Sequence, residues 1–215
     1  MSVISVSNDL ANVPRILQAL RVGGVVLLPT DTVLGLATLP NMPAGVDRLY
    51  ALKDRPRAKA LPIMVATFEQ LVDLGVILTP AIEQALASPF VPGALTIAAE
   101  IDPKICPDWL ADRREIAFRI PDAPLLLGLL RQVGPLLVTS ANRAGHPTPA
   151  HASAALAQLA GAPDLVVEGP AGADEASTLI NCTQSPAVIE RLGAISQAQL
   201  AEYLEVRHGL FGAGN

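Results

Sequence analysis

The sequence predicts a single α/β (α+β) domain built on a mixed β-sheet. Apolar runs of strand length alternate along the chain with stretches of helical periodicity, which is typical of this class. Some runs are uniformly apolar and suit central strands, whereas others alternate between apolar and polar residues. No linker or internal repeat divides the 215 residues. We therefore expect one domain over residues 1–207, followed by a Gly-rich, frayed tail over 208–215.

The helices are predicted from the spacing of apolar residues together with start and stop signals. The first has Pro14 in its first turn, and Thr67 with Gln70 forms a capping box at the start of another. The expected helices lie near residues 12–21, 45–52, 67–74, 79–87, 122–134 and 153–160, with a last one from 196 onward. In that last helix the residues expected to face the core are Leu200, Tyr203 and Leu204.

The strands are predicted at short apolar runs bounded by turn residues. They are expected at residues 25–28, 33–38, 61–66, 94–100, 115–120, 136–139, 164–168, 178–182 and 188–190. In the run 115–120, Ile116, Phe118 and Ile120 share one face, which leaves Arg119 on the other. An arginine is thus expected off the core face of a strand.

The composition excludes several classes of protein. With 51% apolar and 16% charged residues, the chain is not disordered. Its apolar runs are far shorter than the roughly 20 residues of a membrane-spanning helix, and no basic stretch followed by an apolar core marks a signal peptide. Cys106 and Cys182 are far apart and suit two reduced thiols. We expect a cytoplasmic protein that does not contact a membrane.

The usual catalytic signatures are missing from the sequence. There is no P-loop, no dinucleotide-binding glycine motif after a strand and no nucleophile elbow. His146, His151 and His208 have no metal-ligand spacing, and we expect them to be ordinary loop or surface residues. A recognisable hydrolase, zinc enzyme or Rossmann dehydrogenase is therefore excluded.

Four polar clusters follow apolar strands. The first is Thr30-Asp31-Thr32, which by itself suits a polar turn as well as a ligand site. The second is a basic loop, residues 53–59, which holds four of the fifteen basic residues and is stiffened by Pro56; a solvated loop is the alternative. The third covers 139–148, and the fourth runs from 169 to 178 with Arg191 nearby.

Together the clusters supply hydroxyl donors and fixed cations, without a general acid–base histidine. Phosphoryl and nucleotidyl transfer needs this set, because positioning and charge neutralisation carry most of the catalysis. The net charge of −5 argues against a protein that mainly grips a nucleic-acid backbone, yet the concentrated basic loop indicates a local anion site.

The order of the clusters is more specific than any one of them. In chain order the motifs are PTDTVLGL at 29–36, K-x-R-P at 53–56, FRIP at 118–121, S-A-N-x-x-G at 140–145, S-T at 177–178 and R-x-G-A-I at 191–195. This series resembles the YrdC-like family of threonylcarbamoyl-AMP synthases, within the YrdC/YciO superfamily, over residues 10–196. The resemblance implies a twisted mixed sheet with flanking helices and a large, concave, positively lined cavity.

The resemblance also implies a reaction. L-threonine, bicarbonate (or CO2) and ATP would give threonylcarbamoyl-adenylate and pyrophosphate, with Mg²⁺ on the phosphates. The chain would thus be a nucleotidyltransferase of tRNA processing. A separate transferase would then move the threonylcarbamoyl group to adenosine 37 of tRNA, the t6A modification, so that tRNA is an indirect partner.

Matching positions imply the site residues. Catalytic roles fall to Lys53 and Arg55. The residues implied for threonine are Thr32, Arg119, Ser177 and Thr178, with Arg119 expected to pair with the carboxylate through its bidentate fork. The residues implied for ATP are Arg55, Lys59, Ser140, Asn142, Thr148 and Arg191. No protein side chain is assigned as a metal ligand.

Four positions depart from the family pattern: Leu34, Ala144, Leu179, where the family has valine, and Leu192, where it has proline. Leu34 stands where the family usually has a tyrosine, which would reshape the amino-acid pocket, and Ala144 replaces a serine. A diverged YciO-like paralogue, which binds a nucleotide, a modified nucleoside or RNA without synthase activity, is therefore an alternative. An RNA-binding module is a third, which the net charge and the few aromatic residues disfavour.

Overall fold

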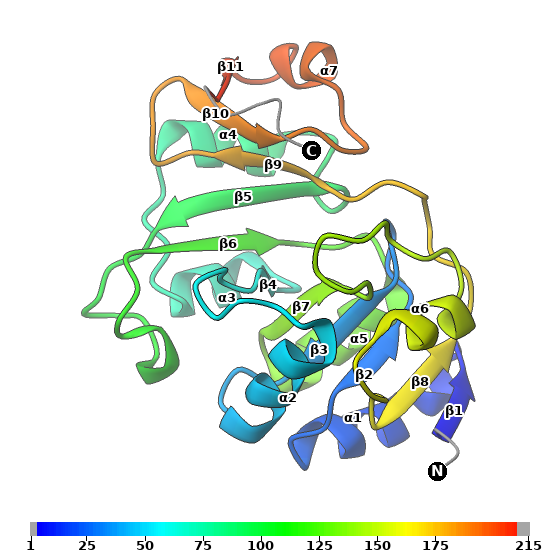
Figure 1. The fold of residues 1–215 in the computed structure, drawn as a ribbon. Helices are drawn as coiled ribbons and strands as arrows, with labels where there is room; N and C mark the ends of the chain where they lie inside the picture. Colours follow the sequence, from blue (N-terminus) through cyan, green and yellow to red (C-terminus); the bar gives the residue numbers. More distant parts are fainter. Residues whose placement is uncertain (1–3, 210–215) are drawn as a thin grey trace.

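A computed structural model describes residues 4–209 of the chain, and these residues form a mixed α/β fold around one twisted sheet (Figure 1). The sheet has the strand order β1-β8-β2-β3-β7-β4-β6-β5-β9-β10-β11, and both parallel and antiparallel neighbours occur. The strands are β1 (Ile4–Ser7), β2 (Val26–Leu28), β3 (Gly35–Thr38), β4 (Ile63–Met64), β5 (Leu95–Glu100), β6 (Glu115–Arg119), β7 (Leu136–Ser140), β8 (Leu165–Glu168), β9 (Thr178–Asn181), β10 (Ala187–Arg191) and β11 (Val206–His208). The predicted fold class is confirmed.

Helices are present at all the predicted places. They are α1 (Val13–Arg21), α2 (Pro43–Lys53), α3 (Phe68–Asp73), α4 (Pro80–Ala87), α5 (Pro124–Val133), α6 (Ala152–Gln158) and α7 (Gln197–Ala201), with short 3-10 turns at Leu10–Asn12 and Asp108–Leu110. The side chain of Thr67 accepts from the Gln70 amide, and Ser196 with Gln199 completes a reciprocal capping box. These polar caps explain why the starts of α3 and α7 could be predicted closely.

The differences from prediction lie at edges and short elements. The edge strands β1 and β11 were not predicted, because they are only four and three residues long and most of their side chains are exposed. Only two residues of the predicted strand 61–66 form β4. His208 belongs to β11 rather than to a frayed tail, whereas the rest of that predicted tail from 210 lies outside the described residues. Tyr203 is 46% exposed and not inward, and its ring lies nearly perpendicular to that of Phe90.

Alternate residues of the central strands feed two cores, one on each face of the sheet. Val26 and Leu28 of β2 pack with Ile16 of α1 and Leu129 of α5, whereas Leu27 belongs to the other core. Figure 1 shows α1 and α5 on one face of the lower part of the sheet, with α2 and α6 on the other. A strand covered on both sides reads as a continuous apolar run, which is the pattern seen in the sequence.

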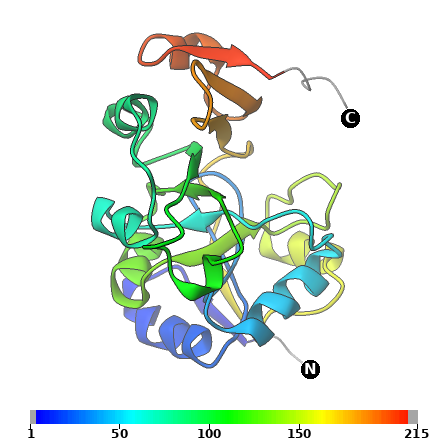
Figure 2. The same cartoon turned by 90° about the vertical axis from the view of Figure 1, so that its left-hand side faces the viewer.

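The sheet changes direction along its length, and this bend creates room for a site. Strands β5, β6 and β9 run at a large angle to β2, β3 and β8 (Figure 1). Figure 2 shows β10, β11 and α7 at the end of the molecule opposite α1 and α2. Side chains from both parts face each other at the bend. No helix of the described residues is long and apolar enough to cross a membrane.

Three carboxylates lie near one another on the upper strands. Glu115 of β6 is directly opposite Glu100 of β5, and the charge of Glu190 on β10 also reaches it. Partial burial, the Glu190 charge and the Glu100 charge raise the pKa of Glu115, although a hydrogen bond from Asn181 acts in the opposite direction. Like charges directly opposite on neighbouring strands destabilise a sheet.

Replacing Glu115 with glutamine is expected to raise the melting temperature at pH 7 by about 2 °C. The pKa of Glu115 is raised in the folded state. Its contribution to the free energy of unfolding is therefore lost as the pH rises from the ordinary pKa of a glutamate through the raised pKa of Glu115. At pH 4 and below, where the glutamate is protonated, the gain should vanish. Thermal unfolding at both pH values measures this. Glu205→Gln, at an exposed position, is the control, and an equal gain in both variants would contradict the argument.

Candidate functional site

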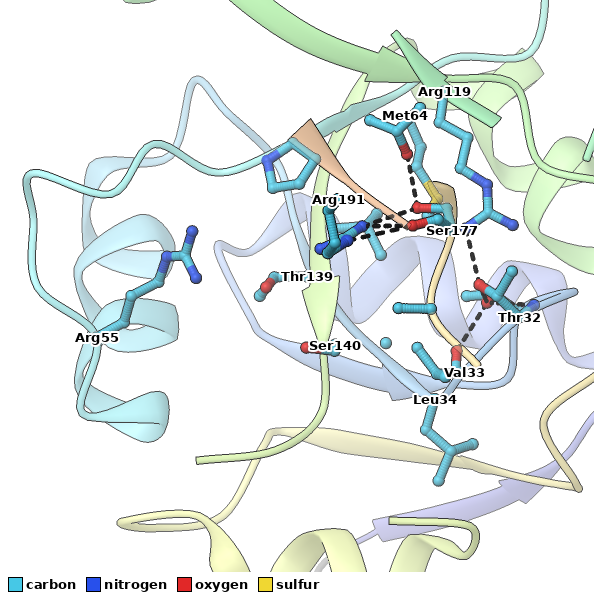
Figure 3. A pocket seen from close by; sticks show the side chains of 16 residues that line it. Thr32, Val33, Leu34, Arg55, Met64, Arg119, Thr139, Ser140, Ser177 and Arg191 are labelled. Atoms are coloured by element: carbon cyan, nitrogen blue, oxygen red, sulfur yellow. Dashed lines mark hydrogen bonds between the residues drawn. The ribbon is translucent and has the colours of Figure 1, made fainter. Parts of the chain in front are cut away.

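A cavity of about 140 Å³ opens at the bend of the sheet, and residues of all four predicted clusters line it (Figure 3). Six of the predicted site residues contribute to its wall: Thr32, Arg55, Arg119, Ser140, Ser177 and Arg191. They come from the turn after β2, the loop after α2, the ends of β6, β7 and β10, and the residue before β9. The tertiary structure therefore brings together side chains that are far apart in the sequence.

The turn after β2 is both a folded turn and a cavity wall. Thr30 Oγ1 donates to the carbonyl of Val33 at 2.7 Å and accepts from the Thr32 amide at 3.1 Å. The two hydroxyl oxygens are 3.1 Å apart, and since the hydrogen of Thr30 is already donated, Thr32 is the donor between them. Thr30 thus holds the turn, while Thr32 faces the cavity and has a lone pair left for a ligand.

Arg119 is buried at the end of β6, with only 4% of its surface exposed. Its Nε donates to the carbonyl of Gly93 at 2.7 Å, and its Nη1 donates to Thr32 Oγ1 at 2.8 Å. Nη2 lies 2.6 Å from a carboxylate oxygen of Asp31, but neither Nη2 nor the second Asp31 oxygen has a well-formed hydrogen bond within the described residues. Burial lowers the pKa of Arg119, and the Asp31 charge opposes that shift.

A second hydrogen-bonded group closes the opposite wall. Arg191 donates from Nε and Nη2 to the carbonyl of Ser177, at 3.2 and 2.8 Å, and from Nη2 to Ser177 Oγ at 3.1 Å. Ser177 Oγ lies 2.7 Å from Thr96 Oγ1 of β5. Burial, followed by the charges of Arg119 and Arg55, lowers the pKa of Arg191. The wall is therefore strongly positive.

Sequence reasoning missed Thr96, which also lines the cavity. The signal was present, because Thr96 is a single hydroxyl inside the otherwise apolar run 94–99. A polar residue at such a position must find a partner on folding, and here that partner is Ser177.

Two cations of the basic loop have different surroundings: Lys53 is buried, and Arg55 faces the cavity. Lys53 is 1% exposed and does not line the cavity; its Nζ donates to the carbonyls of Ser140 and Asn142, the latter at 2.7 Å. Burial and the neighbouring Arg55 charge lower the pKa of Lys53 to about 8. Arg55 lines the cavity and is half-buried, with Nε and Nη2 donating to the carbonyls of Lys59 and Ala60.

Four more of the predicted residues lie outside the cavity wall: Lys59, Asn142, Thr148 and Thr178. Lys59 is exposed and Thr148 half-buried. The side-chain Nδ2 of Asn142 donates to the carbonyls of Arg143 and His146, at 3.0 and 2.6 Å, and so stabilises the loop after β7. His146, His151 and His208 are all exposed, as predicted.

Thr178 is fully buried and bound to the segment after β10. Its Oγ1 donates to the carbonyl of Ile195 at 2.7 Å and accepts from the amides of Gly193 and Ile195. Replacing it with valine is expected to lower the free energy of unfolding by about 2 kcal/mol, since one buried carbonyl and two amides lose their partner. Urea unfolding measures the change. Thr178→Ser should retain most of the stability, and a valine variant as stable as the wild type would contradict this role.

Leu34 stands where the resemblance led us to expect an altered amino-acid pocket. It lines the cavity, but it is fully buried and belongs to the core beneath the sheet. Figure 3 shows its side chain directed away from Arg119 and Arg191. Its carbonyl also accepts from the Ala141 amide at 2.7 Å, which ties the turn after β2 to the loop after β7. The leucine thus fills the core next to the cavity.

Metal ligands do not gather in the described part of the chain. Within residues 4–209, no group of three or more His, Cys, Asp or Glu side chains is placed to hold an ion. Cys106 and Cys182 are both free thiols, and burial raises the pKa of Cys182 to about 12. The cavity itself is lined by arginines and hydroxyls, and such groups suit an anionic ligand.

Comparison with known proteins identifies the family of the chain. A family model for the Sua5/YciO/YrdC domain, described as telomere recombination, matches residues 18–193. The threonylcarbamoyl-AMP synthase of Bacillus subtilis is 36% identical over 206 residues, covering 92% of this chain and 59% of that protein. The threonylcarbamoyl-AMP synthase of Photobacterium profundum is 32% identical over 189 residues, covering 84% of this chain and 98% of that protein.

Solved structures agree with the fold. Sua5 of P. abyssi, complexed with L-threonine, superposes with a TM-score of 0.82 at 25% identity, covering 96% of this chain and 63% of that one. YciO of E. coli superposes with a TM-score of 0.77 at 22% identity, covering 91% and 96%. The chain spans less than two thirds of the length of the B. subtilis and P. abyssi proteins. With most of its length matched by the family model, the chain belongs to the Sua5/YciO/YrdC family.

Proposed function

We propose that the protein is a threonylcarbamoyl-AMP synthase, which makes threonylcarbamoyl-adenylate and pyrophosphate from L-threonine, bicarbonate or CO2, and ATP. The observation that carries the proposal is the convergence of Arg55, Arg119 and Arg191 on one cavity, beside the hydroxyls of Thr32 and Ser177. Such a cavity suits a carboxylate and phosphates together. Relatives that bear this name, and the complex of P. abyssi Sua5 with L-threonine, support the choice of substrates.

The proposed chemistry has two steps. The amine nitrogen of threonine bonds to the carbon of CO2 and releases a proton, which gives a carbamate. A carbamate oxygen then bonds to the α-phosphorus of ATP while the bond to pyrophosphate breaks. Arg55 and Arg191 would neutralise charge on the phosphates, because both are fixed cations at the cavity wall. Mg²⁺ is proposed only as the ion that accompanies the ATP phosphates.

The other assignments follow the geometry. Thr32, Arg119 and Ser177 are proposed for the threonine end of the cavity, and Ser140 for the nucleotide end. Lys53 is proposed to act through the loop after β7, since its ammonium group is already bound to the oxygens of Ser140 and Asn142. Thr178 is proposed to hold Ser177 in place. Lys59, Asn142 and Thr148, which lie outside the cavity wall, remain proposed for ATP.

The product adenylate is an activated acyl donor, so a transferase is the class of enzyme that would consume it. We propose the threonylcarbamoyl transferase of tRNA modification as this downstream partner, with tRNA as the indirect acceptor at adenosine 37.

An assay of the purified protein with ATP, labelled bicarbonate and L-threonine tests the proposal. Labelled adenylate and pyrophosphate should appear together and depend on threonine, and Arg55→Ala should abolish both while leaving the fold intact. No adenylate above that variant would contradict the synthase. Nucleotide binding without turnover would then favour a diverged paralogue, and RNA binding that weakens steeply with salt would favour an RNA-binding module.

A further inference from the structure

We propose that Thr96 and Ser177 form a hydroxyl pair in the cavity wall, which presents one hydroxyl hydrogen to the anionic group of the ligand. The inference rests on the proposed function for the choice of ligand. It adds a residue that no motif of the sequence assigned. Its basis is the hydrogen-bond count of the Thr96, Ser177 and Arg191 group.

The hydroxyl pair has one more hydrogen to donate than it has acceptors within the group. Thr96 and Ser177 carry one hydroxyl hydrogen each, and one of the two lies between the oxygens, which are 2.7 Å apart. Arg191 Nη2 donates to Ser177 Oγ at 3.1 Å and so occupies one of its lone pairs. The second hydroxyl hydrogen is donated to no acceptor among residues 4–209. Whichever oxygen is the donor within the pair, one hydrogen is left for a ligand.

Because the pair is buried, the free hydroxyl hydrogen matters for ligand binding. Thr96 is 4% exposed and Ser177 is 6% exposed, yet both line the cavity. A buried hydroxyl without an acceptor is unfavourable, so a ligand oxygen at this point would gain a hydrogen bond already oriented by β5 and the residue before β9. The pair thus acts as one unit that offers a single oriented hydroxyl hydrogen.

The surrounding charge selects the ligand group. Arg191 is bound to Ser177 itself, and the charges of Arg119 and Arg55 also reach Arg191. A cation such as an ammonium group would be repelled here, whereas a carboxylate or a phosphate would be attracted. Thr32, on the other wall, has only a lone pair to offer and suits a donor group. The Thr96 corner therefore recognises an anion, either the carboxylate of an amino acid or a phosphate of a nucleotide.

Calorimetric titration of wild type, Thr96→Val and Thr96→Ser with L-threonine and, separately, with ATP tests the inference. Valine keeps the shape but removes the hydroxyl, and we expect about 10-fold weaker binding of the ligand whose anion meets the pair. Serine should restore affinity to within about 2-fold. A loss confined to threonine identifies the carboxylate, and a loss confined to ATP identifies a phosphate. Unchanged affinity for both ligands in the valine variant would overturn the inference.

A matched control separates positioning from stability. Thr38 is equally buried, donates to the carbonyl of Gly24 and does not line the cavity, so Thr38→Val should lower the melting temperature without changing either affinity. If the wild-type protein binds neither L-threonine nor ATP, that result contradicts the proposed function and leaves the inference about Thr96 to be tested with another anion. Pyrophosphate then serves as the anion, and the inference fails if wild type does not bind it or if Thr96→Val binds it as tightly as wild type.

Discussion

Replacing Arg119 with lysine is expected to weaken L-threonine binding by about 10-fold or more, while ATP affinity changes by less than about 3-fold. A lysine keeps the charge, but its single nitrogen cannot reach Gly93, Thr32 and Asp31 at once. The Thr32 hydroxyl would lose the donor that orients it. The threonine end of the cavity should therefore be disturbed more than the nucleotide end.

Titration of the Arg119→Lys variant with each substrate separates the two effects, and thermal unfolding shows whether the variant is folded. Arg48→Lys is the control, since Arg48 forms a half-exposed ion pair with Asp164 on the surface. It should change neither affinity. Equal losses of threonine and ATP binding in Arg119→Lys would count against its assignment to the amino-acid end.

Replacing Lys53 with methionine is expected to lower the free energy of unfolding by about 3 kcal/mol and to abolish adenylate formation. Methionine is similar in length, but it offers no donor to the carbonyls of Ser140 and Asn142, nor to the Asn142 side chain 3.4 Å away. These oxygens are buried or partly buried. Without a donor they would favour a different conformation of the loop after β7. Ser140, which lines the cavity, would move with it.

Urea unfolding and the adenylate assay measure the two effects of the Lys53→Met variant. Lys104→Met, at an exposed position, should leave the stability within about 0.5 kcal/mol of wild type. Arg55→Met provides a contrast, because Arg55 is only half-buried and bonds to its own loop; it should lose activity but little stability. If Lys53→Met is as stable as wild type, the ammonium group does not support the loop.

The elements of the fold could be predicted because their signals are local. The apolar period of α1, the caps at Thr67 and Ser196, and the continuous apolar runs of β2 and β7 each lie within a few residues of the structure they specify. The edge strands β1 and β11 could not be predicted this way, since they are only four and three residues long and most of their side chains are exposed.

The class of the fold, the polar clusters and, through the order of those clusters, the family could be inferred from the sequence, although the basic loop follows a helix, α2, and not a strand. Which side chains of those clusters face the cavity depends on how distant strands pack together. Lys53 turns into the loop after β7, Thr178 ties down a neighbouring segment, and Thr96 joins the wall. The physical reason is sequence separation: Arg119 meets Thr32 across 87 residues, and Thr96 meets Ser177 across 81. Local periodicity carries no information about partners that only the packing of distant strands brings together.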